Sequence, residues 1–126
     1  MNAKFHPAIL LITALISCLS FLDAQETAKV SSRQQAIDDM QAIAVQFRTY
    51  QLICGTLPTE SEGISALVLK PEGASDRWKQ LLKLIPVDPW GRDYIYKLAP
   101  KTRFGFIISS KGVDPESSDD DIHFTE

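Results

Sequence analysis

The spacing of apolar residues changes once along this chain, at the segment Pro86–Gly91. Before Pro86 the apolar residues recur at steps of three, four or seven, the spacing of helices that bury one face. After Gly91 they alternate with polar residues, which is the spacing of strands. Helices first and strands last, with short connections, predict an α+β domain whose small C-terminal antiparallel sheet packs on a long helix.

The long helix is predicted from Ala28 to Leu52, a stretch without Gly or Pro. Gly55 follows Cys54 and can supply the left-handed conformation on which helices often end. Such a stripe of apolar residues favours a core-facing role over a binding surface. The positions expected to face the core are Val30, Ile37, Met40, Ala44, Phe47 and Tyr50, and those expected to face solvent include Asp38, Asp39, Gln46 and Arg48.

Two short helices and three strands are predicted after the long helix. Thr59 stands three residues before Glu62, the spacing of a capping box, and opens the first short helix, which ends at Lys70–Gly73. Ser75 can cap the second, which closes before Pro86. The buried sides are expected to carry Ile64, Leu67 and Val68, then Trp78, Leu81 and Leu82, and the strands are expected at Asp93–Leu98, Phe104–Ser109 and Asp121–Thr125.

The first 24 residues have the layout of a Sec signal sequence. Lys4 precedes an uncharged run from Phe5 to Leu22, and a polar stretch follows. The strongly apolar part, Ala8–Leu22, is about 15 residues long, short of the roughly 20 that cross a bilayer as a helix. The sequence therefore predicts a signal peptide over residues 1–24, cleavage between Ala24 and Gln25, and export of one domain over residues 25–126.

The same residues are also compatible with two other fates of the N-terminus, an uncleaved membrane anchor and a lipidated cysteine. Leu22, at the third position before the cut, is bulkier than a signal peptidase prefers, which leaves an uncleaved anchor open. The run Leu15–Cys18 resembles a lipobox, in which Cys18 would carry a lipid, although the apolar residues after it count against lipidation. After cleavage at Ala24 only Cys54 remains, so no intramolecular disulfide is expected.

No catalytic constellation is visible in the sequence. His123 is the only histidine left after cleavage, and nothing around it or around Cys54 supports a nucleophilic pair. Glu60 and Glu62 are better explained as acids in the first turn of a helix than as an acid–base pair. The chain has no glycine-rich phosphate loop, no CxxC pair and no histidine cluster for a transition metal. We therefore predict that the protein is not an enzyme.

Acidic residues concentrate near the C-terminus. Residues 25–113 hold 12 Lys and Arg against nine Asp and Glu, whereas residues 114–126 hold six acids and no base. Such a segment disfavours nucleic acid as a partner and favours a cation. Carboxylates, hydroxyls and carbonyls are the oxygen ligands that Ca²⁺ takes, but Pro115 and the lack of a following glycine exclude an EF-hand. From these residues alone, a calcium-binding loop and a solvated disordered tail both stay open.

Several motifs occur in a fixed order between about Gln41 and Ile122. The longest is Pro86–Tyr96, PVDPWGRDYIY, and it is followed by SKGVD at Ser110–Asp114 and by Asp121-Ile122. Together they resemble the C-terminal globular part of the major pseudopilin of type II secretion systems, the G-type subunit. The positions that carry this structural signature are Pro58, Gly63, Asp88, Pro89, Trp90, Gly91, Tyr94 and Tyr96, and we expect them to be scaffold residues.

The resemblance implies a pseudopilin-like, non-catalytic component or accessory of a type II secretion or type IV pilus-like apparatus. Its partners would be other pseudopilins or apparatus proteins, with no nucleic acid and no small-molecule substrate. It would work in the periplasm of a Gram-negative-type bacterium, at the membrane only if the N-terminus is uncleaved or lipidated. The resemblance also implies Ca²⁺ in the acidic loop, residues 110–122, with the Lys111 carbonyl, Asp114 and Asp121 as ligands, and Asp119 and Asp120 complete the predicted set.

The sequence departs from the family pattern in two places. Only Pro115–Asp120 separates Asp114 from Asp121, and this stretch has no glycine, whereas the family's loop is longer and glycine-rich. The N-terminus shows no glycine before a prepilin-peptidase cut and no long apolar helix with a glutamate at the fifth mature position. A second interpretation therefore stays open, in which the chain is a free periplasmic calcium-dependent binding module, or a lipoprotein, with the same fold.

Overall fold

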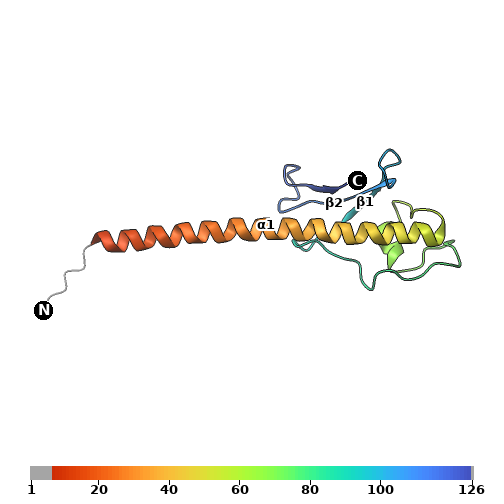
Figure 1. The fold of residues 1–126 in the computed structure, drawn as a ribbon, viewed down its shortest axis with the longest axis horizontal. Coiled ribbons are helices and arrows are strands. Elements are labelled where there is room, and N and C mark those ends of the chain that lie inside the picture. Colours follow the sequence, from red (N-terminus) through yellow and green to blue (C-terminus); the bar gives the residue numbers. More distant parts are fainter. Residues whose placement is uncertain (1–6, 126) are drawn as a thin grey trace. The chain divides into compact units, whose positions relative to one another are not determined.

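The computed structural model describes the backbone of residues 7–125 and the side chains of residues 24–125. The chain divides into two compact units, Met1–Ser32 and Arg33–Glu126. Helix α1 (Pro7–Cys54) belongs to both units, and all other elements belong to the second (Figure 1). These are the 3-10 helix η1 (Gly63–Leu67) and the strands β1 (Ile95–Leu98), β2 (Phe106–Ser110) and β3 (Ile122–Phe124).

The three strands form an antiparallel sheet in the order β1-β2-β3. Tyr96 of β1 lies opposite Ile108 of β2, which lies opposite Phe124 of β3. Aromatic side chains join the sheet to α1, since the Phe47 ring stacks on the Tyr96 ring with centroids 4.3 Å apart. The predicted α+β fold, a long helix packed against a small antiparallel sheet, is confirmed.

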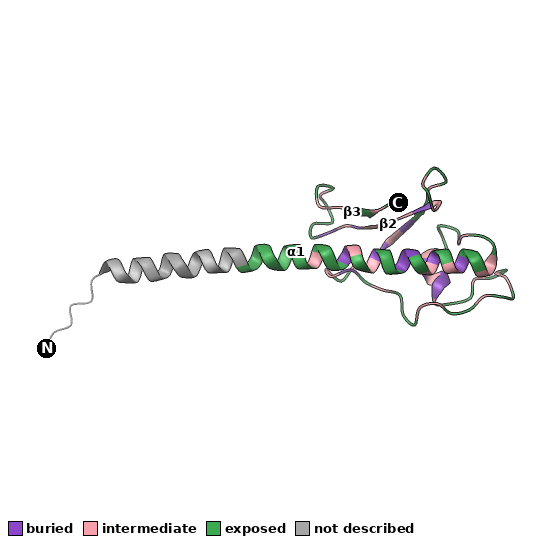
Figure 2. Cartoon of the chain, in the orientation of Figure 1, coloured by how far each residue is buried: buried purple, intermediate pink, exposed green. Residues whose placement is uncertain are grey.

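The buried face of α1 begins at Ala36. Met40 and Phe47 are fully buried, and Ala44 and Tyr50 nearly so, as the apolar spacing predicts. Before Ala36 the described part of the helix is almost entirely exposed (Figure 2). Val30 is 60% exposed, so its predicted core position is wrong, because it belongs to the unit Met1–Ser32 and not to the unit that contains the sheet.

Only one of the two predicted short helices forms. The capping box closes as predicted, because Thr59 N–H donates to Glu62 Oε2 at 2.8 Å and Glu62 N–H donates to Thr59 Oγ1 at 3.3 Å. It opens the 3-10 helix η1, not an α-helix, and buries Ile64 and Leu67. The segment after Ser75 makes a turn and then no helix, so the second short helix is a wrong prediction.

The physical reason lies in where the second segment sends its hydrogen bonds. Trp78 Nε1–H donates to the carbonyl of Ala66 at 2.9 Å. The N–H groups of Leu81 and Leu82 both donate to the carbonyl of Leu67, also at 2.9 Å. The segment thus satisfies its donors on η1 instead of on its own preceding turn, and Trp78, Leu81 and Leu82 still pack partly buried against the core.

Helix α1 is longer than the predicted Ala28–Leu52, because it begins at Pro7 and passes through the predicted cleavage point between Ala24 and Gln25. The predicted lipid site Cys18 and the other side chains of residues 1–23 lie outside the described side chains. Among the described residues, no helix is both long enough and apolar enough to span a membrane. Cleavage, anchoring and lipidation therefore stay predictions.

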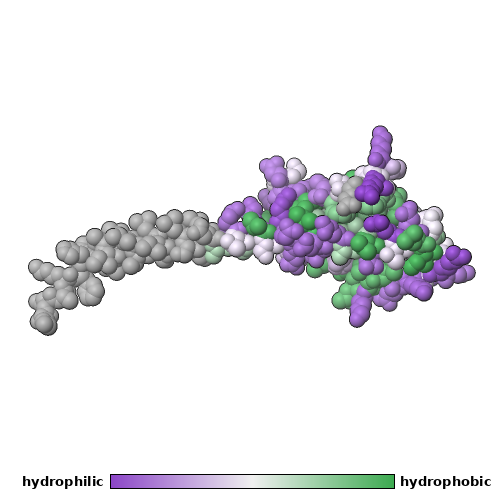
Figure 3. Space-filling model, in the orientation of Figure 1, coloured by the Kyte–Doolittle hydropathy of each residue, from purple (hydrophilic) through white to green (hydrophobic). Residues whose placement is uncertain are grey.

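Some large apolar side chains remain at the surface of the second unit. Leu52, Leu69 and Leu84 are the most exposed of them. On the face drawn in Figure 3 the apolar residues lie in patches among hydrophilic ones. Scattered exposed apolar residues of this kind are ordinary in soluble domains and do not by themselves mark a binding site.

Candidate functional site

The signature turn, Asp88–Arg92, is built around one buried carboxylate. Asp88 is 3% exposed, and its Oδ1 accepts the N–H groups of Trp90 at 3.1 Å and Arg92 at 2.8 Å. Pro89 suits the second position of a turn, which is closed by Gly91 N–H donating to the Asp88 carbonyl at 2.9 Å. Gly91 has a φ of +82°, which favours glycine. The local sequence thus dictates a rigid turn.

The same carboxylate connects this turn to the end of β2. Asp88 Oδ2 accepts the hydroxyl of Ser110 at 2.6 Å, and Ser110 Oγ in turn accepts the N–H of Gly112 at 3.1 Å. From the other side, the Arg92 guanidinium donates to the carbonyls of Gly112 at 2.6 Å and Val113 at 3.2 Å. The signature turn therefore holds the first residues of the segment that leaves β2.

Sequence reasoning missed the role of Arg92. It is not among the signature residues named above, and its contacts lie about 20 residues further along the chain, so no local spacing points to them. The sequence offered only an indirect indication of these contacts, namely an arginine inside a turn and a loop of carbonyls and carboxylates further along the chain. Only the antiparallel pairing of β1 with β2 brings the two segments together.

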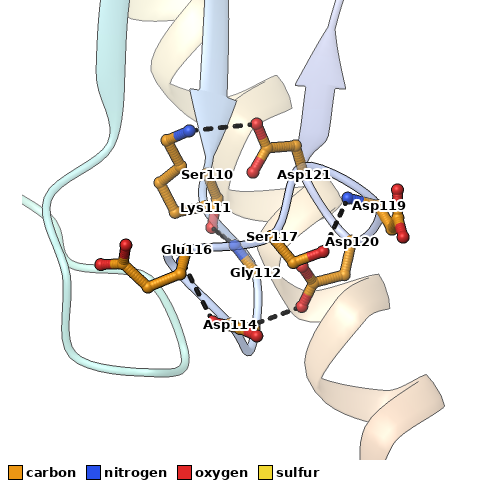
Figure 4. Close-up of polar contacts among 9 residues, drawn as sticks. All are labelled: Ser110, Lys111, Gly112, Asp114, Glu116, Ser117, Asp119, Asp120 and Asp121. Carbon is orange, nitrogen blue, oxygen red and sulfur yellow. Dashed lines mark hydrogen bonds and ion pairs between the residues drawn. The ribbon is translucent and has the colours of Figure 1, made fainter.

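The middle of the acidic loop, residues 111–121, lies between β2 and β3 and is organised by its own polar groups (Figure 4). Asp120 Oδ2 accepts the N–H of Asp114 at 2.9 Å, and Asp114 Oδ1 accepts the N–H of Glu116 at 3.0 Å. Ser117 Oγ accepts the N–H of Asp119 at 3.2 Å. The loop is thus a folded turn system in this structure, and not the disordered tail that the sequence left open.

Gly112 is the position in the loop where glycine is required. Its φ is +65°, and a Cβ built there would overlap the backbone carbonyl and the carboxylate of Asp120. The strand end and the far side of the loop therefore approach each other too closely for any side chain. This contact explains why glycine stands between Lys111 and Val113.

Lys111 and Asp121 form an ion pair across the base of the loop. The Lys111 Nζ lies 3.2 Å from Asp121 Oδ2, and the Asp121 side chain is 13% exposed while that of Lys111 is 43% exposed. The other oxygen, Asp121 Oδ1, is buried and has no hydrogen-bond partner among the described residues. One ammonium thus neutralises this carboxylate without satisfying both of its oxygens.

The predicted calcium ligands can be compared with this geometry. Asp120 and Asp121 are half-buried at the base of the loop, whereas Asp114 and Asp119 are exposed. The contact that Lys111 makes with this set is the ion pair between its ammonium and Asp121. Within the described side chains, no group of three or more Asp, Glu, His or Cys residues is arranged to hold a metal ion. Carboxylates and the unsatisfied Asp121 Oδ1 suit the chemistry of Ca²⁺, but the full ligand set is not gathered.

The two signature tyrosines have structural surroundings. Tyr94 Oη–H donates to Asp39 Oδ2 and Tyr96 Oη–H donates to the Pro58 carbonyl, both at 2.9 Å. Burial, more than any neighbouring charge, raises the pKa of both phenols well above its usual range. Both side chains therefore stay protonated at physiological pH. Tyr94, the residue before β1, is joined to α1, and Tyr96 of β1 is joined to the segment before η1.

The remaining residues that the sequence singled out are Pro58, Gly63, Trp90, Ala24, Gln25 and Asp39. Pro58 is fully buried beneath the sheet, and Gly63 opens η1 with a φ of +50°. Trp90 packs partly buried against the core. Ala24 and Gln25 are exposed residues of α1. The solvent-facing prediction for Asp39 needs correction, because its carboxylate is half-buried under the Tyr94 hydroxyl.

Comparison with known proteins gives a consistent answer. Residues 21–124 match the family described as type II secretion system (T2SS), protein G. The type II secretion system core protein G of Pseudomonas aeruginosa is 35% identical, over 87% of this chain and 84% of its own. The core protein G of Aeromonas hydrophila is 31% identical, over 90% of this chain and 82% of its own.

A solved structure agrees with these relatives. The major pseudopilin from the type 2 secretion system of enterohaemorrhagic Escherichia coli superposes with a TM-score of 0.66 at 30% identity, covering 79% of this chain and 90% of that chain. These relatives are structural subunits and not enzymes, which confirms the prediction that this chain is not catalytic. The extent of the family match and the agreement of the fold show that this chain belongs to the type II secretion system protein G family.

Proposed function

We propose that this chain works in the periplasm as a pseudopilin that packs beside other pseudopilins of a type II secretion or related pilus-like apparatus, using α1. The observation that carries the proposal is the extent of the family match, which begins at residue 21 and therefore includes residues 21–54 of α1 as well as the unit that contains the sheet. The exposed helical surface before Ala36, which the core does not use, is available for helix–helix packing.

Gene deletion in the bacterium that encodes the chain tests this function. Loss of the chain is expected to retain normally secreted proteins inside the cell, and a plasmid copy is expected to restore secretion. The level of the other pseudopilins serves as a control for polar effects. Normal secretion in the deletion strain would instead favour the free periplasmic binding module, since such a module is not needed for export of other proteins.

We further propose that Ca²⁺ stabilises the acidic loop. Support comes from Asp121 Oδ1, which is buried without a hydrogen-bond partner among the described residues, and from the other carboxylates that the same loop carries (Figure 4). Asp121 would be a ligand, and bound Ca²⁺ would supply positive charge and oxygen coordination that the loop's own hydrogen bonds do not provide. A cation at Asp121 competes with the Lys111 ammonium for the same carboxylate.

Thermal unfolding in Ca²⁺ and in chelator tests the calcium proposal. A ligand that binds only the folded state raises stability by mass action, so the Tm is expected to rise by several degrees with Ca²⁺. Asp121→Asn is expected to remove that rise, and Glu72→Gln, an exposed change outside the loop, is expected to keep it. Equal Tm values for the unchanged chain in both solutions would refute a calcium site.

A further inference from the structure

A hollow of about 440 Å³ lies between the C-terminal part of α1 and the β1–β2 hairpin, and two arginines line it. The guanidinium carbons of Arg48 and Arg103 lie 4.6 Å and 5.3 Å from the centroid of the Phe104 ring. Both side chains are exposed, and Gln51 and Thr102 add polar groups to the lining. We call this surface the arginine pocket.

Neither arginine of the pocket forms an ion pair within the described part of the chain. The ion pairs there are Lys70–Asp76 and Lys111–Asp121, and neither involves Arg48 or Arg103. Two guanidinium groups near one ring repel each other, and an anion bound in the pocket would lower that repulsion. A guanidinium presents a planar fork of donors that matches a carboxylate. The pocket therefore fits a carboxylate ligand.

The chain itself carries a dense group of carboxylates, but at the other end of the same strand. The hairpin that forms the arginine pocket leads into β2 at Phe106, and the acidic loop leaves β2 at Ser110. Arg92 and Asp88 fix the start of that loop at its own end of the sheet. The arginine pocket and the acidic loop therefore lie at opposite ends of β2, and their charges are opposite in sign.

One acid of the loop is oriented for an outside partner. Glu116 is exposed, and its carboxylate extends away from the other carboxylates of the loop (Figure 4). Its backbone is held by the hydrogen bond to Asp114 Oδ1. Glu116 is also outside the predicted calcium set, so Ca²⁺ at the base of the loop would leave its charge available.

We propose that the acidic loop of one copy of this chain, through Glu116, docks into the arginine pocket of a second copy. Two different surfaces of one chain then meet in a heterologous contact, the kind that repeats along a filament when the rotation between copies does not close a ring. The inference rests on the proposed function as a pseudopilin, and it names a contact between the subunits.

Charge reversal in the full chain tests the contact. A photo-crosslinking residue in place of Thr102 reports a second copy at the pocket, measured in cells that carry the complete apparatus and in the presence of Ca²⁺. Arg103→Glu and Glu116→Arg are each expected to lower the crosslinked dimer by about fivefold or more, because like charges then face each other. The two changes together are expected to restore it. Arg77→Glu and Glu72→Arg, both exposed and outside the two surfaces, are the matched controls.

Two results would overturn the proposal. They are single variants that crosslink like the unchanged chain, and a double variant that does not recover. Secretion by the unchanged chain is scored in the same cells. Normal secretion with an unaffected crosslink refutes only this contact, whereas a deletion strain that still secretes refutes the proposed function.

Discussion

At the scale of single residues, Asp88 has the largest structural effect in the signature turn. Its carboxylate accepts two backbone N–H groups within the turn and the hydroxyl of Ser110 on β2. These three donors explain how a charged group can be 3% exposed. Without them, only the Arg92 guanidinium would hold the turn to the start of the acidic loop.

Asp88→Ala is therefore expected to destabilise the protein by about 3 kcal/mol, because it leaves buried donors without acceptors. Urea unfolding monitored by circular dichroism measures this change in the free energy of unfolding. Asp88→Asn keeps the acceptor for the turn and should lose less. A loss below about 1 kcal/mol in the alanine variant would contradict the role assigned to the carboxylate.

Lys111 provides a second prediction at this scale. Its ammonium neutralises Asp121, so Lys111→Met removes the competitor of any divalent cation at that carboxylate. We expect the variant to reach its calcium-stabilised Tm at a lower Ca²⁺ concentration than the unchanged chain. A titration of Tm against Ca²⁺ gives the midpoint, and Lys79→Met, an exposed lysine outside the loop, is the control. An unchanged or higher midpoint would show that the ion pair does not compete.

Residue types in the candidate site were easier to predict than their contacts. The carboxylates of the loop stand out from charge alone, and Asp121 is one of the half-buried groups there. Arg92, Ser110 and Gly112 act through contacts between distant segments. Those contacts depend on sheet register and on the approach of the loop to β2, which no single-sequence pattern specifies.

At the scale of elements, α1 and the sheet follow from local patterns, because apolar spacing and strand alternation repeat over enough residues to exceed chance. The second short helix failed for a related reason. The Ser75 hydroxyl does accept the Arg77 N–H at 3.2 Å, as a helix cap would, but no helical hydrogen bonds follow it, so the segment forms only a turn. The donors of the segment bond to carbonyls of η1 instead, and the local sequence does not predict such distant acceptors.

The tyrosines that join the elements predict how stability depends on pH. Burial raises the pKa of Tyr50 to about 12 and shifts the pKa of Tyr94 and Tyr96 in the same direction. An unfolded tyrosine loses its proton near pH 10, whereas the folded one keeps it to higher pH. The contribution of these phenols is therefore complete below about pH 10 and decreases as the pH rises toward the folded pKa.

We expect the free energy of unfolding to fall between about pH 10 and pH 12, and to fall less steeply in Tyr94→Phe, which cannot ionise. Urea unfolding at pH 9 and pH 11 measures the slope. At pH 9 the same variant should lose about 1 kcal/mol through the missing hydrogen bond to Asp39. Identical slopes for the variant and the unchanged chain would contradict the contribution of Tyr94.

At the scale of the whole molecule, the described part of α1 before Ala36 lies outside the core and is available for assembly. Among the side chains that the structure describes, the buried core residues all lie at or after Ala36, inside the unit Arg33–Glu126. The described part of α1 before Ala36 is exposed except for the partly exposed Ser32, yet the family match includes it from residue 21. An exposed helical segment that the core does not need is consistent with a surface for other subunits.

A chain that begins at Arg33 is therefore expected to fold with nearly the stability of one that begins at Gln25. The two free energies of unfolding should agree within about 1 kcal/mol, because the deleted residues contribute no buried apolar area to the core. In cells, an exported form that begins at Arg33 should nevertheless fail to restore secretion to the deletion strain, since it lacks the first part of α1. Restored secretion by this form would show that assembly does not need the first part of α1, and a large loss of stability would place part of the core before Arg33.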